Sequence, residues 1–206
     1  MDLTKLFKAQ KELDERIVKE KGLEGQDLLD KKILALQVEL GELANEWRGF
    51  KFWSNDQDPR DWAPNEKDIC ESCNGEPIFI ENSKIVGQCK NCDGCGVHFH
   101  NPLLEEYVDC LHFILSIGLE IKEIQNKPVE NFNYYSFKNP FGITQAFTDL
   151  MREFPLTVID DEEGLYIRLF CEFIGLGEML GFTWEEVEQA YLSKNKINHE
   201  RQEQGY

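Results

Sequence analysis

Apolar side chains recur at helical spacing along most of the chain, which predicts a mainly helical protein. Thr183, followed three positions later by Glu186, forms a capping-box pattern that should start a terminal helix. The segment around Leu111 is apolar on almost every side, so we expect its helix to lie at the centre of the fold. Helices are expected at residues 3–21, 27–49, 103–124, around 143–151, 161–180 and 184–203.

The helical pattern is interrupted between about residues 50 and 100. Residues 50–65 lack periodicity and contain two prolines, so they are expected to form a loop. Residues 66–100 contain two short apolar runs that predict a β-hairpin turning at Asn82-Ser83. We therefore predict an all-α helical bundle formed by residues 1–65 and 101–206, with residues 66–100 as a small insertion.

Composition limits the classes of partner. With 206 residues, 41% of them hydrophobic, the chain can bury one main core. The formal net charge of −17 disfavours nucleic acid, because Lys and Arg must replace counterions along a phosphate backbone. A small polyphosphate remains compatible if divalent cations screen the carboxylates. The N-terminus lacks the apolar segment of a signal peptide, and the longest apolar run is too short to cross a bilayer. We therefore expect a cytoplasmic protein without membrane contact.

Two acidic pairs stand at helical spacing on separate predicted helices. Glu39 and Glu42 form one pair, and Glu106 and Asp109 form the other. If these helices pack together, four carboxylates converge, and divalent cations are needed to hold like charges so close. Acidic pairs are also common on solvated faces, but Glu106 and Asp109 lie in an apolar segment, where an unused charge is costly. The pattern predicts a Mg²⁺ site suited to a polyphosphate substrate.

The terminal helix carries a complementary polar stripe. Lys194, Asn198 and Arg201 are spaced i, i+4 and i+7 and therefore share one face. Taken alone, such a stripe is usually an ordinary solvated face. Together with the acidic pairs, it is a candidate for binding phosphate groups.

Two CxxC pairs predict a zinc-knuckle site inside the insertion. The expected ligands are Cys70, Cys73, Cys89 and Cys92. Their spacing is typical of tetrahedral zinc in a structural site. Cys95, His98 and His100 are alternative ligands, and a redox function of the CxxC pairs is a minor alternative. Because acidic residues outnumber cations in the insertion, we favour stabilisation or contact with a protein partner over nucleic-acid binding.

Four stretches of the chain form a further pattern: residues 35–46 (ALQVELGELANE), 50–53 (FKFW), 105–113 (EEYVDCLHF) and 194–206 (KNKINHERQEQGY). Together they resemble the dimeric dUTPases of the all-α NTP pyrophosphatase superfamily, which also includes the MazG-like enzymes. The two acidic pairs are common to that superfamily. The C-terminal stretch and the His-Phe that follows the second acidic pair narrow the resemblance to the dUTPase branch.

This resemblance implies a homodimer that hydrolyses dUTP to dUMP and pyrophosphate with Mg²⁺. It implies that the metal is held by Glu39, Glu42, Glu106 and Asp109. One glutamate of the first pair would also orient or deprotonate the attacking water. The phosphates would be bound by Lys194, Asn198 and Arg201. Two alternatives remain open: a broader pyrophosphohydrolase acting on dCTP or another nucleotide, and a regulatory binding module built on the same scaffold.

The resemblance also implies a base pocket formed by Gln10, Trp53, His112 and Phe113. Without the family pattern, Trp53 and Phe113 would fit a core role, His112 a hydrogen-bonded interior histidine, and Gln10 a half-exposed helix face. One departure concerns the base or ribose contacts, because the family often has Asn four residues after the glutamine and this chain has Asp14.

Overall fold

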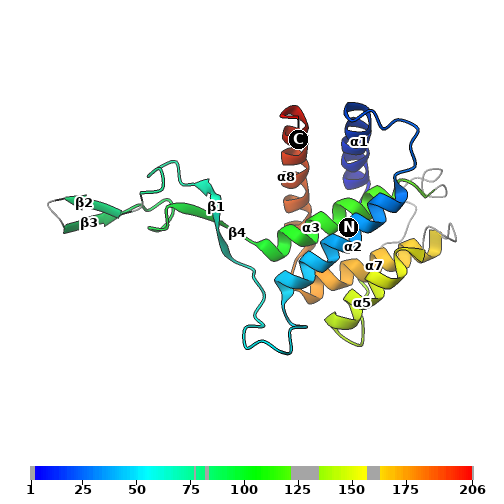
Figure 1. Cartoon of the computed structure of the whole chain (residues 1–206). Helices are drawn as coiled ribbons and strands as arrows, with labels where there is room; N and C mark the ends of the chain where they lie inside the picture. The colour runs from blue at the N-terminus through cyan, green and yellow to red at the C-terminus, as the bar shows by residue number, and fades with distance from the viewer. Residues whose placement is uncertain (1–2, 77, 82–83, 122–134, 157–162, 206) are drawn as a thin grey trace.

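A computed structural model describes residues 3–76, 78–81, 84–121, 135–156 and 163–205. The predicted hairpin turn at Asn82-Ser83 and the predicted start of the helix at residue 161 lie outside these residues. Figure 1 shows a bundle of helices in three layers, with a long arm extending from one side. The prediction of an all-α bundle with a small β insertion is confirmed.

Helix α3 (Pro102–Gly118) forms the centre of the bundle, as its all-round apolar pattern predicts. It begins where the Asn101 side chain accepts a hydrogen bond of 2.9 Å from the backbone N–H of Leu104, with Pro102 in the first turn. Leu111, Ile114 and Leu115 are fully buried. Helix α3 packs most extensively against α2 (Leu29–Trp47) and also contacts α1, α7 and α8.

Helix α2 ends two residues earlier than the pattern predicts. Its last residue is Trp47, because Arg48 adopts a left-handed conformation with φ of 64°. The Arg48 guanidinium donates to the backbone carbonyl and to the carboxylate of Asp56, each at 2.8 Å. These hydrogen bonds join the end of α2 to the loop that follows it and stabilise the turn at Arg48.

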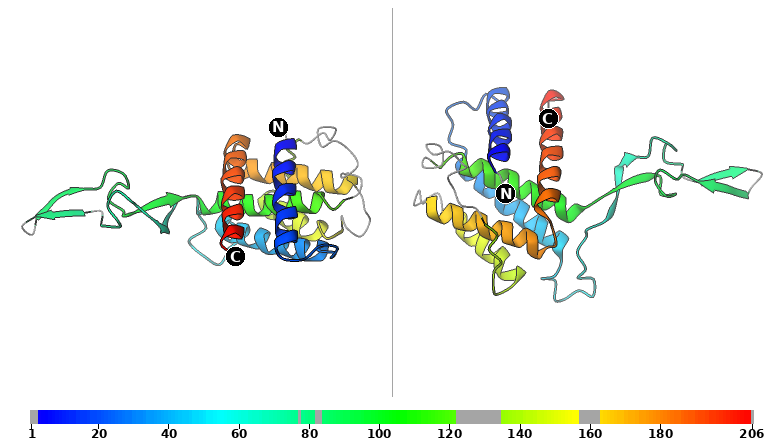
Figure 2. Two further views of the ribbon diagram at one scale, coloured as in Figure 1. Left: turned by 90° about the horizontal axis from the view of Figure 1, so that it is seen from above. Right: turned by 180° about the vertical axis from the view of Figure 1, so that it is seen from behind.

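Helices α1 (Thr4–Glu20) and α8 (Trp184–Glu203) stand side by side on one side of α3, as the views in Figures 1 and 2 agree. The predicted capping box of α8 is present, with Thr183 and Glu186 exchanging hydrogen bonds. The buried Tyr191 hydroxyl on α8 lies 2.9 Å from the side-chain oxygen of Gln10 and 3.3 Å from the carbonyl oxygen of Leu6, both on α1, and thereby links the two helices. The opposite layer consists of α5 (Ile143–Glu153) and α7 (Glu163–Met179).

The arm contains two antiparallel strand pairs. Strand β1 (Ala63–Ile69) pairs with β4 (Val97–His100) near the bundle, and β2 (Ile78–Glu81) pairs with β3 (Lys84–Gln88) at the far end (Figure 1). Strand β1 therefore begins three residues before the predicted insertion boundary at residue 66. The arm has a buried cluster of its own, made of cysteines and separate from the bundle core. In the part of the chain that the structure describes, no helix is both long and apolar enough to span a bilayer.

Candidate active site

Packing of α2 against α3 brings three of the four predicted acidic residues together. Glu39 and Glu42 lie on α2, Glu106 lies on α3, and one carboxylate oxygen of each is within 4.8 Å of the others. The i,i+3 spacing places Glu39 and Glu42 on adjacent turns of the face that meets α3. The cluster is an arrangement of oxygen donors suited to a hard divalent cation.

The environment of this cluster raises the affinity of its carboxylates for protons. The pKa of Glu39 is raised to about 7, mainly by burial and in addition by the charges of Asp109 and Glu42. Burial also raises the pKa of Glu106 to about 7, again reinforced by Asp109 and Glu42. Around neutral pH the site therefore retains protons that a bound divalent cation would displace.

Asp109 lies one turn further along α3 and is bound to a lysine. The Lys194 ammonium from α8 donates to the Asp109 carboxylate at 2.7 Å and to Glu105 at 2.9 Å. Burial raises the pKa of Asp109, although Lys194 opposes this effect. Burial lowers the pKa of Lys194, but its two carboxylate partners outweigh that effect and raise it. Lys194 thus neutralises part of the acidic site from the opposite helix.

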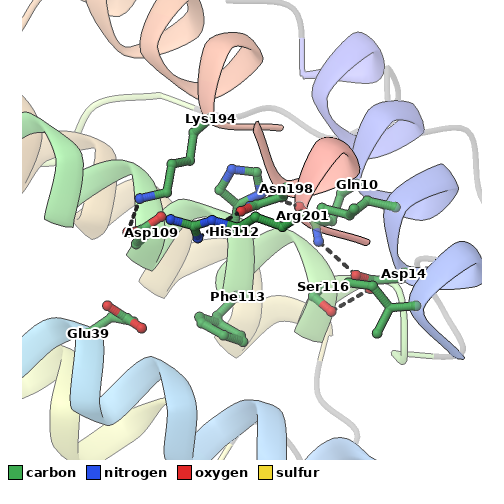
Figure 3. A pocket seen from close by; sticks show the side chains of 12 residues that line it. Gln10, Asp14, Glu39, Asp109, His112, Phe113, Ser116, Lys194, Asn198 and Arg201 are labelled. Atoms are coloured by element: carbon green, nitrogen blue, oxygen red, sulfur yellow. Dashed lines mark hydrogen bonds and ion pairs between the residues drawn. The ribbon is translucent and has the colours of Figure 1, made fainter. Parts of the chain in front are cut away.

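A cavity of about 300 Å³ opens beside the acidic cluster, between α1, α3 and α8 (Figure 3). Its lining includes eight residues singled out from the sequence, namely Gln10, Glu39, Asp109, His112, Phe113, Lys194, Asn198 and Arg201. Its remaining lining residues are Leu13, Asp14, Ile17 and Ser116. The predicted metal, phosphate and base groups therefore contribute to one continuous space.

Trp53 is placed differently. It lies on the loop after α2 with 66% of its surface exposed, in edge-to-face contact with Phe50 and Phe52. It is not among the residues that line the cavity. Its assignment to the base pocket remains a prediction.

A buried hydrogen-bond network forms the end of the cavity furthest from the acidic cluster. The side-chain oxygen of Gln10 accepts from the Tyr191 hydroxyl at 2.9 Å and lies 2.8 Å from Nδ1 of His112. The Gln10 amide nitrogen donates to Asp14 at 2.7 Å. Burial lowers the pKa of His112 to about 3, helped by the charge of Lys194, so its ring is neutral at physiological pH.

Three participants in these contacts were not predicted from the sequence: Tyr191, Ser116 and Glu105. Ser116 follows Asp109 and His112 at helical spacing on α3, which is a signal that could have identified it. Tyr191 likewise precedes Lys194 and Asn198 at helical spacing, and Glu105 precedes Asp109 by four positions, so the same signal applies to both.

The four predicted cysteines of the arm also converge. Each offers a sulfur within 4.8 Å of the others, and the Cys70–Cys89 and Cys73–Cys92 sulfur pairs are 3.9 and 3.8 Å apart. Tetrahedral zinc with Zn–S bonds of about 2.3 Å requires sulfur separations of about 3.8 Å. Cys95 is exposed and, with His98 and His100, lies outside this cluster. The geometry fits a four-cysteine metal site.

The chain was compared with curated proteins and with models of known protein families. A search of curated proteins finds no match for the chain. A protein-family model described as dUTPase matches residues 2–69 and 98–206, which together make up well over half of the chain and leave out most of the arm. The helical bundle, with its acidic cluster and cavity, falls within the matched residues, and the chain therefore belongs to the dimeric, all-α dUTPase family.

Proposed function

We propose that the protein is a dUTP diphosphatase that hydrolyses dUTP to dUMP and pyrophosphate. The observation that carries this proposal is the shared cavity, which is lined by Glu39 of the acidic cluster, by the polar stripe of α8 and by the aromatic ring of Phe113. Membership of the dUTPase family supports the same reaction class.

The donor set fits Mg²⁺, which prefers carboxylate oxygens and retains water. Glu39, Glu42 and Glu106 would hold the ion, with Asp109 contributing once Lys194 releases it. When bound, Mg²⁺ would supply charge neutralisation at the phosphates and a more acidic water. Glu39 is the residue of the cluster that also lines the cavity, and its pKa of about 7 suits a general base that takes a proton from water.

The phosphate contacts would come from α8. Lys194, Asn198 and Arg201 follow one face of this helix and all line the cavity. Lys194 is 11% exposed and already faces the acidic site through Asp109, so a phosphate group would take the place of that carboxylate as its partner. This arrangement explains how a chain with a net charge of −17 can bind a triphosphate.

The base would occupy the opposite end of the cavity, where the Phe113 ring offers a stacking surface and Gln10 and His112 offer polar contacts. Leu13 and Ile17 add apolar surface to the lining of the cavity. A pyrimidine base fits this mixture of apolar walls and a few polar groups.

The proposal is tested by measuring pyrophosphate release from dUTP, dCTP, dTTP and UTP, with and without Mg²⁺. We expect Mg²⁺-dependent hydrolysis with the highest kcat/KM for dUTP. Glu42→Gln and Asp109→Asn should abolish turnover while leaving the helical circular-dichroism spectrum intact. Glu188→Gln is the matched control, because Glu188 on α8 pairs with Lys5 at 3.0 Å away from the cavity and should leave kcat unchanged. Full activity of both acidic-site variants would refute the site assignment.

We also propose that the chain forms a homodimer, as its family does, and that the arm holds one structural zinc ion. Leu34 and Val38 support the first proposal, because they stand on the outer face of α2 with 63% and 50% of their surface exposed. The sulfur geometry of Cys70, Cys73, Cys89 and Cys92 supports the second. Sedimentation equilibrium tests the dimer, and a monomer at micromolar concentration would contradict it.

A further inference from the structure

Asp14 is a carboxylate held firmly at the base end of the cavity. Its Oδ1 accepts from the Gln10 amide nitrogen at 2.7 Å, one helical turn earlier on α1. Its Oδ2 accepts from the Ser116 hydroxyl at 2.5 Å and lies 3.4 Å from the Lys32 ammonium. Contacts from α1, α2 and α3 therefore fix this carboxylate in one position.

The Asp14 carboxylate determines the orientation of the Gln10 amide. A carboxylate can only accept hydrogen bonds, so the group of Gln10 that faces it at 2.7 Å must be the NH₂. The flipped amide would place two oxygens in contact at that distance. An asparagine at position 14 would offer both an oxygen and an NH₂, and it would therefore accept either orientation of Gln10.

This orientation in turn determines which nitrogen of His112 carries the proton. The Gln10 oxygen faces His112 Nδ1 at 2.8 Å, and an amide oxygen can only accept, so Nδ1 must be protonated. In the neutral ring, Nε2 then carries a lone pair. That atom is buried and has no hydrogen-bond partner among the residues that the structure describes.

The unpartnered Nε2 points to a ligand. His112 is 6% exposed, lines the cavity, and stacks on Tyr191 with 4.2 Å between ring centroids, so its ring is held in place. A buried acceptor without a partner is unfavourable, and a ligand that brings an N–H to it relieves that cost.

We infer that Asp14 is a positioning residue that fixes the His112 tautomer through Gln10, so that the cavity selects a pyrimidine whose N3 carries a hydrogen, as uracil does. Cytosine presents a bare N3, whose lone pair would face that of His112. The identity of the ligand rests on the proposed function, whereas the tautomer does not. A mismatch of this kind reduces kcat/KM by roughly 10-fold to 100-fold.

The first test is the tautomer itself, measured on the full-length ¹⁵N-labelled protein by two-bond ¹⁵N–¹H correlations of the histidine rings. His112→Phe identifies the His112 signals among the four histidines. We expect the wild-type ring to be protonated at Nδ1 only, and Asp14→Asn to introduce the Nε2-protonated form. Wild-type protein with a proton on His112 Nε2 would overturn the inference without the need for any variant.

The matched control is Asp149→Asn. Asp149 accepts from Gln145 at 2.8 Å across the same i,i+4 spacing, but on α5 and away from the cavity. The Asp149→Asn variant loses the same charge and the same type of hydrogen bond as Asp14→Asn, but it should leave the His112 signals unchanged. An Asp14→Asn spectrum identical to that of Asp149→Asn would show that Asp14 does not fix the tautomer.

The second test is the ratio of kcat/KM for dUTP to that for dCTP. Asp14→Asn should lower this ratio by roughly 10-fold, mainly through KM, and Asp149→Asn should preserve it. An unchanged ratio despite a changed tautomer would refute the selectivity part of the inference. Failure of the wild-type protein to hydrolyse either nucleotide would refute the proposed function and the base selection, while the spectra would still decide whether Asp14 fixes His112.

Discussion

Binding of Mg²⁺ to the acidic cluster should release protons in an amount that depends on pH. Glu39 and Glu106 each have a pKa of about 7, so each is about half protonated at pH 7 in the metal-free protein. Mg²⁺ requires ionised carboxylates, so its binding at pH 7 should expel about one proton in total. The number should rise toward about two at pH 5 and fall toward zero at pH 9.

The same shifts determine how the metal-free protein responds to pH. Both carboxyls have a higher pKa in the folded protein than the ordinary value of 4.5, so the folded state holds more protons than the unfolded chain between about pH 4.5 and 7. These two groups therefore make the metal-free fold less stable as pH rises through that window. Mg²⁺ should remove this loss, because it replaces the protons as the counter-charge.

Isothermal titration calorimetry measures the proton release directly, as the dependence of the binding heat on the ionisation enthalpy of the buffer. The titration is performed at pH 7 with Mg²⁺ and nucleotide-free protein in two buffers. Glu106→Gln should release about half as many protons as the wild type, and Glu188→Gln should release the same number. A binding heat that does not depend on the buffer at pH 7 would refute the reasoning about the cluster.

Three further predictions concern the arm and the core. Cys92→Ser should lose the bound zinc measured by atomic emission, whereas Cys95→Ser should keep it, because Cys95 lies outside the sulfur cluster; loss in both would contradict the assignment. Leu111→Ala should lower the free energy of unfolding in urea by about 2–5 kcal/mol, whereas the exposed Lys11→Ala on α1 should change it by less than about 0.5 kcal/mol. Gly175→Ala should lower Tm by several degrees, because its Cβ would lie 2.0 Å from the Phe137 carbonyl oxygen; an unchanged Tm would disprove this close contact.

Patterns within short stretches of sequence were sufficient to predict the positions of the helices and of the candidate metal sites. Helical periodicity located the helices and identified α3 as central, and the Thr183–Glu186 pattern located the start of α8. The spacing of the cysteines and of the acidic pairs identified both candidate metal sites. These features could be read from the sequence because helix geometry and knuckle spacing relate residues only a few positions apart.

Only the tertiary structure decided how these groups are connected. It joined Gln10, His112 and Tyr191 from three helices, paired Asp109 with Lys194, and left Trp53 outside the cavity. It also placed the Asp14 carboxylate against Gln10 and Ser116. Helical spacing determines which residues share a face, but the partner of each face depends on how distant segments pack, and a buried polar group acquires its role from that partner.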